Sequence, residues 1–423
     1  MPITPVFPEK TKTEKYVALL GFIAERWDDT VRETKADVGQ LIGLPKPYTV
    51  PCCREHFQQI YYWDTFYTNE GLLAQGRLDL ARGNVDNLLY LAERFGFVPN
   101  GNATYFLGRS QPPHLALMVD RIFETSHDLD WLRSALPALE KEQAFWRERR
   151  TTALGLAHYG THASDEELLE VWAQPDERGV RPPEPAERSG KIREAAHMHA
   201  ICESGWDFCP RFDRRTLDFF PVDLNALLWA SERMLEKAHL LLGDATAALR
   251  WREAADKRTA LMRKFLWSSE LGAFVDYDYV NGRQSALVSA AMFYPVWMGL
   301  CDASEAESIM RLLPRLERNH GILACEPGPR DIHYQWDAPN AWPPLQYATV
   351  QALIVAGQRQ DATRVAKAFL DTVVINFDRT GDLWEKYNAD TGDLNVTNEY
   401  GLPAMMGWTA GVSVALATLL EAP

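Results

Sequence analysis

The sequence lacks long apolar runs, a leader-like start and an excess of positive charge. No uncharged stretch approaches the roughly 20 apolar residues of a membrane-spanning helix. The start, Met1 to Val6, has no basic segment followed by an apolar one, so we expect no secretory signal. The chain carries 44 Lys and Arg against 58 Asp and Glu, a net charge of −14. This balance argues against nucleic acid and anionic membranes as partners.

Cysteine is scarce, with six residues in 423, and only Cys52 and Cys53 are adjacent. This distribution matches neither a disulfide framework nor the paired spacing of a zinc site. We therefore expect reduced thiols and a cytoplasmic protein. The chain also shows no internal sequence period, which disfavours a solenoid of recognisable repeats.

Tryptophan is abundant, with 14 residues, and several of them directly precede an aspartate. Trp63-Asp64, Trp206-Asp207 and Trp336-Asp337 have further aromatic or amide neighbours, whereas Trp27-Asp28 lies at a charged helix end. Ring faces stack well on the apolar faces of pyranoses, and carboxylates accept hydrogen bonds from hydroxyls. The recurrence of the pair therefore indicates a pocket that holds a sugar.

Asp207 is the candidate for a general acid. It lies between Trp206 and Phe208 and follows Gly205. Burial of a carboxyl among aromatic rings disfavours its ionised form and raises its pKa, as a general acid at neutral pH requires. An isolated Trp-Asp pair is more often a helix-capping turn with core neighbours, and the choice here rests on the recurrence of the pair.

Apolar residues at helical spacing predict an all-α protein over most of the chain. We predict helices over residues 14–28, 61–74, 77–94, 113–125, 129–150, 222–241, 243–267, 285–299, 303–316, 343–357, 360–378 and 407–420. Residues 274–279 alternate like a strand before Asn281-Gly282 and predict a hairpin. Residues 151–192 are interrupted by prolines and predict a loop excursion within one domain, 1–423.

Four motifs, in order, resemble the trehalase family of inverting glycoside hydrolases. The strongest is Gln335 to Gln346, close to the family's Q-W-D-x-P-x-G-W-x-P signature with Ala341 in place of the glycine. The others lie at 99–113, 203–225 and 385–409, and the resemblance covers about residues 50 to 415. The resemblance implies an (α/α)6 barrel with its active-site loops at one end, and neither metal nor cofactor.

By position, the resemblance implies Asp207 as general acid and Glu385 as general base. Inversion needs one protonated carboxyl and one carboxylate roughly 6.5–9.5 Å apart, so that a water fits between the base and the anomeric carbon. Lys386 would help to hold Glu385 ionised. Glu399 falls on another active-site carboxylate of the family and is the rival base or a substrate ligand.

The resemblance also implies residues that line the pocket for the hydrolysed glucose. Trp63 and Trp336 would offer ring faces, while Asp64 and Asp337 would accept sugar hydroxyls. The remaining substrate-binding candidates are Phe57, Tyr61, Asn102, Arg109, Gln111, Gly205 and Glu399.

Two positions depart from the family pattern. Counting back from Trp63 puts His56 where the family has an arginine, and counting back from Asp207 puts His199 there. Arg54 can fill the first role only if its loop is two residues longer. A histidine cannot reproduce the bidentate fork of a guanidinium. Because the family's arginines lie toward the leaving-group sugar, the hydrolysed glucose is better supported than its partner.

We therefore expect inverting hydrolysis of an α-linked glucoside, with α,α-trehalose as the first-choice substrate. One alternative is an α-glucosidase with a kojibiose-type or glucosylglycerate-type leaving group. A sugar epimerase on the same fold, using histidines such as His197 and His199, and an inactive sugar-binding protein are the others. Metal binding by this pair is disfavoured because the two side chains face apart on a helix. The sequence leaves open whether the protein is a monomer or a homo-oligomer.

Overall fold

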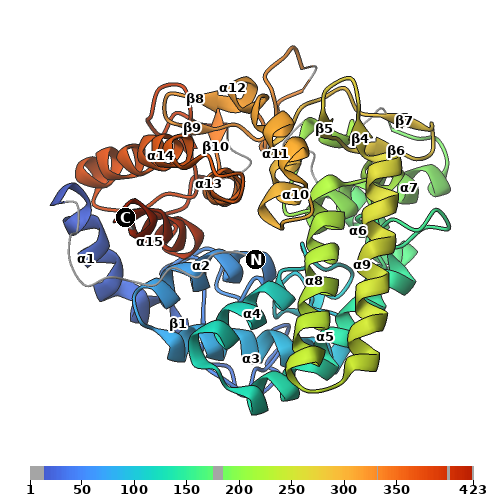
Figure 1. The fold of residues 1–423 in the computed structure, drawn as a ribbon, viewed down its shortest axis with the longest axis horizontal. Coiled ribbons are helices and arrows are strands. Elements are labelled where there is room, and N and C mark those ends of the chain that lie inside the picture. Colours follow the sequence, from blue (N-terminus) through green and yellow to red (C-terminus); the bar gives the residue numbers. More distant parts are fainter. Residues whose placement is uncertain (1–13, 175–183, 331, 398–400, 422–423) are drawn as a thin grey trace.

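The computed structural model describes residues 14–174, 184–330, 332–397 and 401–421. The described chain is dominated by helices, as the hydrophobic periodicity predicts (Figure 1). The described strands have two residues each and lie in the connections between helices. Four antiparallel pairs are formed by β1 (Val31–Arg32) with β2 (Tyr48–Thr49), β4 (Trp267–Ser268) with β5 (Ala273–Phe274), β8 (Glu317–Arg318) with β9 (Gly321–Ile322), and β10 (Asn340–Ala341) with β11 (Tyr387–Asn388). A three-stranded antiparallel sheet has β6 (Tyr277–Asp278) between β3 (Phe219–Phe220) and β7 (Arg283–Gln284).

One set of helices lies toward the middle of the molecule. Each member contacts the next in chain order, and the last contacts the first: α2 (Tyr62–Ala74), α4 (Leu115–Ser126), α8 (Val222–Leu241), α10 (Tyr294–Trp297), α13 (Pro343–Val355) and α15 (Gly407–Glu421). These helices are buried on most of their circumference, and α2 buries every residue from Tyr62 to Asn69. A helix that is buried all round needs neighbours on every side.

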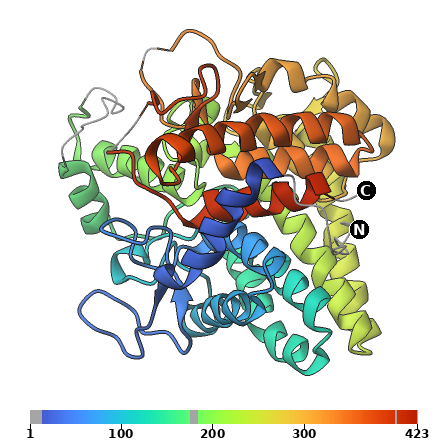
Figure 2. The same cartoon turned by 90° about the vertical axis from the view of Figure 1, so that its left-hand side faces the viewer.

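A second set of helices lies on the periphery (Figure 1): α1 (Val17–Arg26), α3 (Leu78–Phe95), α5 (Leu129–Arg149), α9 (Ala245–Phe265), α11 (Ala303–Met310) and α14 (Arg359–Thr380). Helix α3 packs on α2 and α4, α5 on α4 and α8, and α14 on α13 and α15. Helix α1 crosses α15 in Figure 2 and contacts it. These helices bury one apolar stripe and expose charged residues, which matches their amphipathic sequences.

The first and last helices of the inner set, α2 and α15, pack closely against each other. A Cβ built on Gly71 would lie 2.5 Å from the Cα of Gly411, and one built on Gly411 would lie 2.0 Å from the carbonyl oxygen of Tyr67. Only residues without a side chain allow two helix backbones to approach this closely. The two glycines therefore set the spacing between these helices.

The helix predicted for residues 285–299 is wrong. The structure has a 3₁₀ turn at Ala290–Phe293 and the single turn α10. The backbone of Val288 to Ala290 instead pairs with the segment around Cys325, through the bonds Ala290 N to Ala324 O and Glu326 N to Val288 O, both 2.9 Å. Tertiary pairing thus overrides the local helical pattern.

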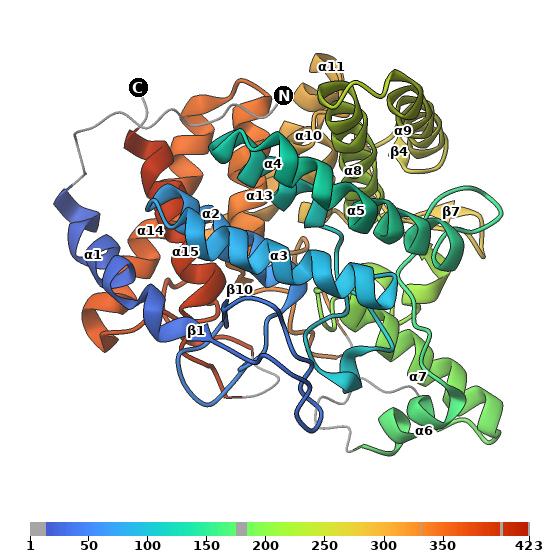
Figure 3. The same ribbon diagram turned by 90° about the horizontal axis from the view of Figure 1, so that it is seen from below.

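Three other expectations changed in detail. The helix predicted for residues 303–316 divides into α11 and α12 (Leu313–Leu316), because Pro314 begins a new turn. The predicted excursion contains α6 (Asp165–Ala173), which starts at a capping box formed by Ser164 and Glu167. Helix α7 (Arg188–Glu203) begins inside the same stretch and packs beside α6 (Figure 3). The predicted hairpin is confirmed as β6 and β7.

No helix among the described residues is both long and apolar enough to cross a bilayer. All six cysteines are free thiols in the structure, in agreement with the expectation from their spacing.

We predict that Gly411→Ala lowers the free energy of unfolding by at least about 2 kcal/mol, because the new methyl group overlaps the backbone of α2. Gly21→Ala is the matched control: Gly21 is exposed in α1 and has nothing within 4 Å of its Cβ position. That change should raise stability by about 0.5–1 kcal/mol. Chemical denaturation of both variants measures the difference, and equal effects would contradict the close-packing argument.

Candidate active site

Tryptophans from separate motifs pack into one buried cluster. The ring of Trp336 stacks on Trp342 at 4.0 Å and on Trp206 at 5.7 Å, and it lies 5.6 Å from Trp63. Trp408 meets Trp63 and Trp342 edge-on at 5.9 and 5.8 Å. Aromatic pairs at these separations are favourable beyond the area they bury. The cluster therefore holds four distant segments of the chain together.

The expectation that Trp63 and Trp336 offer open ring faces is not met. Each side chain is only 1% exposed, because other tryptophans cover its ring. The two residues adjoin the expected site, but in this structure their rings pack the segments that carry the neighbouring aspartates.

A tight turn after α7 carries Asp207. Gly205 has φ +71, and a Cβ there would lie 2.7 Å from the Trp63 ring. Phe208 has φ +54, a left-handed conformation that costs a bulky residue about 1–3 kcal/mol. Gly205 thus lets the turn pass against Trp63, and Asp207 is half-buried between the two left-handed residues.

Two carboxyl groups from distant segments, Glu385 and Asp207, lie within electrostatic reach of Asp64. Asp64, in the first turn of α2, is 7% exposed. Burial raises its pKa to about 8, and the negative charges of Glu385 and Asp207 contribute to that rise. A carboxyl in such surroundings holds its proton at neutral pH. The structure therefore brings the expected acid and base to the same buried aspartate.

Glu385 forms a buried ion pair with the next residue. Lys386 Nζ donates to Glu385 Oε2 at 2.8 Å, and the two side chains are 0% and 2% exposed. The ammonium also lies 4.4 Å from the Trp342 ring centroid. Burial lowers the pKa of Lys386, and the carboxylate opposes that shift. The pair is thus part of the interior and not a surface charge pair.

Short strands fix the Glu385 segment against the strongest motif. Strand β11 follows Glu385 and pairs with β10, so that Ala341 lies opposite Tyr387. Trp408 Nε1 donates to the carbonyl oxygen of Glu385 at 3.0 Å. Two further segments therefore determine where this carboxyl lies.

An aromatic wall stands beside Asp64. Phe57 meets Tyr61 edge-on at 5.6 Å, and Tyr61 meets Phe106 at 5.5 Å. Burial raises the pKa of Tyr61; the charge of Asp64 adds to the rise and that of Arg109 opposes it. Tyr61 therefore lies within electrostatic reach of Asp64, and Phe57 and Phe106 pack against its ring.

Arg109 is held by neutral side chains. Its Nε donates to Asn100 Oδ1 at 3.0 Å, and its Nη1 contacts His199 Nε2 at 2.5 Å. The guanidinium carbon lies 5.4 Å from the Phe106 ring centroid. Of the two histidines at family arginine positions, His199 meets this guanidinium, whereas His56 is exposed in the 51–57 loop.

Asn102 and Gln111 bond the backbone. Asn102 Oδ1 accepts from Ile60 N, and its Nδ2 donates to Ile42 O, both at 2.9 Å. Asn102 is 0% exposed, so its expected role as a hydroxyl ligand is wrong for this structure. Its side chain instead connects the loops of Ile42 and Ile60. Gln111 Oε1 accepts from Trp63 N at 3.2 Å and positions the start of α2.

Asp337 keeps one oxygen without a partner. Arg330 Nε donates to its Oδ2 at 2.9 Å, and Oδ1 is buried with no hydrogen bond from the described residues. Burial raises the pKa of this carboxyl, and Arg330 opposes that shift. Glu399 lies outside the described residues, so the choice between it and Glu385 as base stays a prediction.

Three buried ion pairs that the sequence did not reveal support the Asp207 turn. Arg211 lies 4.4 Å from the Trp206 ring and donates to Asp276 at 2.9 and 2.8 Å and to Asp223 at 2.6 Å. Glu203, at the end of α7, accepts from Arg150 Nε and Nη2, both at 2.8 Å. The only signal in the sequence is that charged residues interrupt an aromatic segment.

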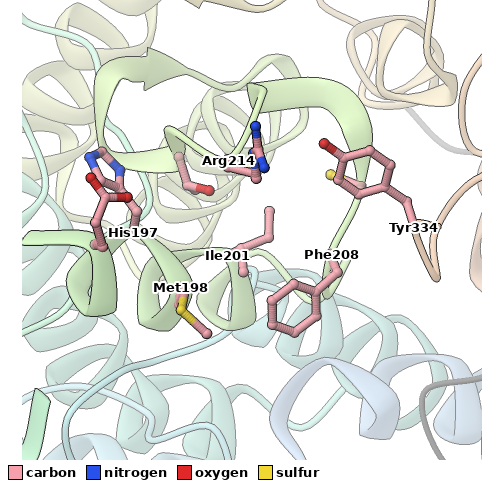
Figure 4. Close-up of a pocket in the computed structure, with 9 residues that line it drawn as sticks. His197, Met198, Ile201, Phe208, Arg214 and Tyr334 are labelled. Carbon is pink, nitrogen blue, oxygen red and sulfur yellow. The ribbon is translucent and has the colours of Figure 1, made fainter. Parts of the chain in front are cut away.

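A small pocket borders the same turn (Figure 4). Phe208 and Met198 form one side, with Arg214 and Tyr334 across from them. Phe208 lines this pocket, whereas Asp207 does not. The pocket is therefore beside the carboxyl groups and separate from them.

Comparisons with known proteins find a family model and several solved structures that are similar to this chain. The family model described as Trehalase matches residues 3–421. The solved neutral trehalase of Saccharomyces cerevisiae is 26% identical and matches over 89% of this chain and 73% of that one, with a TM-score of 0.73.

A mannosylglycerate hydrolase of glycoside hydrolase family 63 from Thermus thermophilus shares the fold. Its structure in complex with Tris and D-glycerate is 18% identical, covers 95% of this chain and 100% of that one, and has a TM-score of 0.63. Its complex with glucose is 17% identical, covers 95% and 99%, and has a TM-score of 0.63.

Asp64→Asn should stabilise the protein at neutral pH by at least about 1 kcal/mol. The folded protein holds the Asp64 proton up to about pH 8, whereas an unfolded aspartate loses it near pH 4. Wild-type stability therefore falls across that window relative to the variant, which carries no titrating group there. Denaturation from about pH 4 to pH 8 measures the widening difference.

Asp79→Asn is the control for that series. Asp79 is exposed and pairs with Arg77. Burial raises its pKa, but the hydrogen bond and charge of Arg77, together with the backbone N–H of Leu80, outweigh burial and lower the pKa. We expect a change of less than about 0.5 kcal/mol with no widening between pH 4 and pH 8. Parallel curves for wild type and Asp64→Asn would contradict a raised pKa at Asp64.

Proposed function

Since the chain belongs to the trehalase family, we propose that this glycoside hydrolase cleaves an α-linked glucoside with inversion, with α,α-trehalose as the first-choice substrate. Asp207 is the proposed general acid and Glu385 the proposed general base. The observation that carries this proposal is that the charges of both residues act on the buried carboxyl of Asp64. This supports the proposal, because glycosidic hydrolysis requires two acids in one site and these two come from motifs far apart in the sequence.

In the proposed reaction, Asp207 donates its proton to the glycosidic oxygen as the bond from that oxygen to the anomeric carbon breaks. A water attacks the anomeric carbon from the opposite face, and Glu385 takes a proton from it. The products are β-glucose and the free alcohol of the leaving group, and both carboxyls return to their starting states after proton exchange with solvent. Lys386 supports this assignment because its ammonium pairs with the base.

We further propose that residues 1–423 form one catalytic domain, an (α/α)6 barrel. The inner ring would comprise α2, α4, α8, α10, α13 and α15, and the sequence of contacts among them supports it. The segment around 151–192, with α6, would form an excursion at the end where the active-site loops lie. The six free thiols support a cytoplasmic location.

The proposed glucose ligands are the polar groups that keep unused hydrogen-bonding capacity. Asp337 Oδ1 would accept a hydroxyl, and Asp64, which holds its proton at neutral pH, would donate to one. Phe57 and Tyr61 would line one side of the sugar. Arg109 would face the leaving group, and Glu399 remains the rival base.

A glycerate-type leaving group is the second candidate. Among the described residues, no carboxylate pairs with Arg109, whose partners Asn100 and His199 are neutral groups. A guanidinium with its full charge suits an anionic leaving group. The fold shared with the mannosylglycerate hydrolase from Thermus thermophilus is consistent with this alternative.

A panel of trehalose, kojibiose, glucosylglycerate and sucrose decides between these substrates, with NMR of the first-formed anomer. We expect β-glucose first from the preferred substrate, because water attacks opposite the α-linked group. First-formed α-glucose would contradict inversion. An epimerised sugar without a second product would support the epimerase alternative.

A substrate whose leaving group needs no proton distinguishes the general acid from the general base. Asp207→Asn should lose at least about 1,000-fold in kcat on the preferred glucoside but far less on α-glucosyl fluoride, because fluoride departs without a general acid. Glu385→Gln should lose comparably on both, since both need an activated water. Steady-state kinetics on the two substrates measure this contrast.

Asp213→Asn is the matched control for these variants. Asp213 is exposed, lies in the same loop as Asp207 and has φ +46, a conformation that asparagine also tolerates. Its kcat should stay within about two-fold of wild type. If Asp207→Asn lost kcat equally on both substrates, Asp207 would not be the general acid. If Glu385→Gln kept full activity, Glu399 would be the general base instead.

A further inference from the structure

His199 lies in the middle of a buried hydrogen-bond chain. It belongs to α7, is 7% exposed, and contacts Arg109 Nη1 through Nε2 and Thr161 Oγ1 through Nδ1, the latter at 2.7 Å. Arg109 in turn donates to Asn100 Oδ1. The chain therefore links α7 to two loops, one on each side of the imidazole.

The partners determine which ring nitrogen carries the proton. A guanidinium can only donate, so Nε2 of His199 must be an unprotonated acceptor. The neutral ring then has its proton on Nδ1 and donates it to Thr161 Oγ1. The Thr161 hydroxyl donates to Gly108 O at 3.2 Å and accepts from Ala163 N at 3.0 Å, which is consistent with that direction. Every bond in the chain has one donor and one acceptor.

Charged groups around the imidazole favour its neutral form. Burial lowers the pKa of His199 to about 3, and Arg109, His162 and Arg150 add to that shift. Glu203 lies nearby but is engaged by both Nε and Nη2 of Arg150. His199 therefore stays an acceptor for Arg109 throughout the neutral pH range.

The ring is also held sterically. A Cβ built on Gly108 would lie 3.0 Å from His199 Cε1 and 3.0 Å from the Cβ of Ala163. This glycine lets the loop before Arg109 lie flat against the imidazole. A side chain at position 108 would push the ring away from the guanidinium.

We propose that His199 is a positioning residue, which holds the guanidinium of Arg109 in place as an uncompensated cation for the leaving-group side of the substrate. The inference rests on the proposed glycosidase function and on the contacts of Arg109 with Asn100, His199 and Phe106. Arg109 Nη2 has no partner among the described residues and remains available to a ligand.

The contrast with Arg150 explains why a neutral acceptor suits this role. Two nitrogens of Arg150, Nε and Nη2, donate to the carboxylate of Glu203. The charge of this guanidinium is therefore neutralised, and its role is structural. An imidazole orients a guanidinium through one bond but brings no negative charge. The charge of Arg109 is therefore kept for a hydroxyl-rich or anionic group of the substrate.

Three variants test the proposal by steady-state kinetics on the preferred glucoside. His199→Phe keeps a ring but removes the acceptor, and we expect kcat/KM to fall about 10- to 100-fold, mainly through KM. His199→Gln restores an oxygen acceptor and should recover activity to within about five-fold of wild type. In an Arg109→Ala background, His199→Phe should change kcat/KM less than about two-fold, because its effect passes through Arg109.

His197→Phe is the matched control on the same helix. His197 is 4% exposed, and its Nδ1 accepts from Leu217 N at 3.2 Å, so its replacement also removes a buried acceptor. We expect a loss of stability similar to that of His199→Phe and a kcat/KM within about two-fold of wild type. Equal loss of kcat/KM in both variants, or additive effects of Arg109→Ala and His199→Phe, would overturn the proposal.

A measurement without substrate separates this inference from the proposed function. Nitrogen-15 NMR of the histidine-labelled full chain should find His199 neutral and protonated at Nδ1 from pH 5 to pH 8. If wild type cleaves none of the glucosides, the proposed function fails, while this spectrum still decides whether His199 accepts from Arg109. An imidazolium, or a proton on Nε2, would overturn the pairing.

Discussion

The stacking of Trp336 on Trp342 and Trp206 is the interaction on which the rest of the site depends. Three tryptophans of the cluster directly precede a carboxyl group, Trp63 before Asp64, Trp206 before Asp207 and Trp336 before Asp337. Trp408, from α15, donates to the backbone of Glu385. Because the indoles pack together, Asp207 and Glu385 lie within electrostatic reach of Asp64. The Trp-Asp pair thus combines an anchoring residue with a functional one.

The buried charges divide into two groups according to their partners. Arg211 and Glu203 have partners of opposite charge and join the turn of Asp207 to α8 and to the loops around Arg150. Asp64, by contrast, faces other carboxyls, and its pKa rises to about 8 through burial and through their charges. Arg211 and Glu203 are thus neutralised by their partners, whereas Asp64 is crowded by like charges although Glu385 itself pairs with Lys386. A carboxyl with a pKa perturbed in this way is typical of functional sites.

Most helices could be predicted from apolar spacing, because a buried stripe repeats with the helical period. The prediction failed where another segment competes for the backbone, as at residues 288–290, which pair with the chain around Cys325. At the site, the segments that the trehalase resemblance selected remain a prediction, and the structure shows what packs on several of their residues. Asn102 bonds two loops, and the rings of Trp63 and Trp336 are covered, since a motif does not reveal what packs on its residues.

The sequence by itself determined the helical class, the family, and the pairing of aromatic rings with carboxyl groups, since these follow from spacing and local order. Only the tertiary structure decided that Asp64 shares its surroundings with Glu385 and Asp207, and that His199 meets Arg109. Those relations join residues tens to hundreds of positions apart. They arise from the packing of helices and loops, which no local pattern encodes.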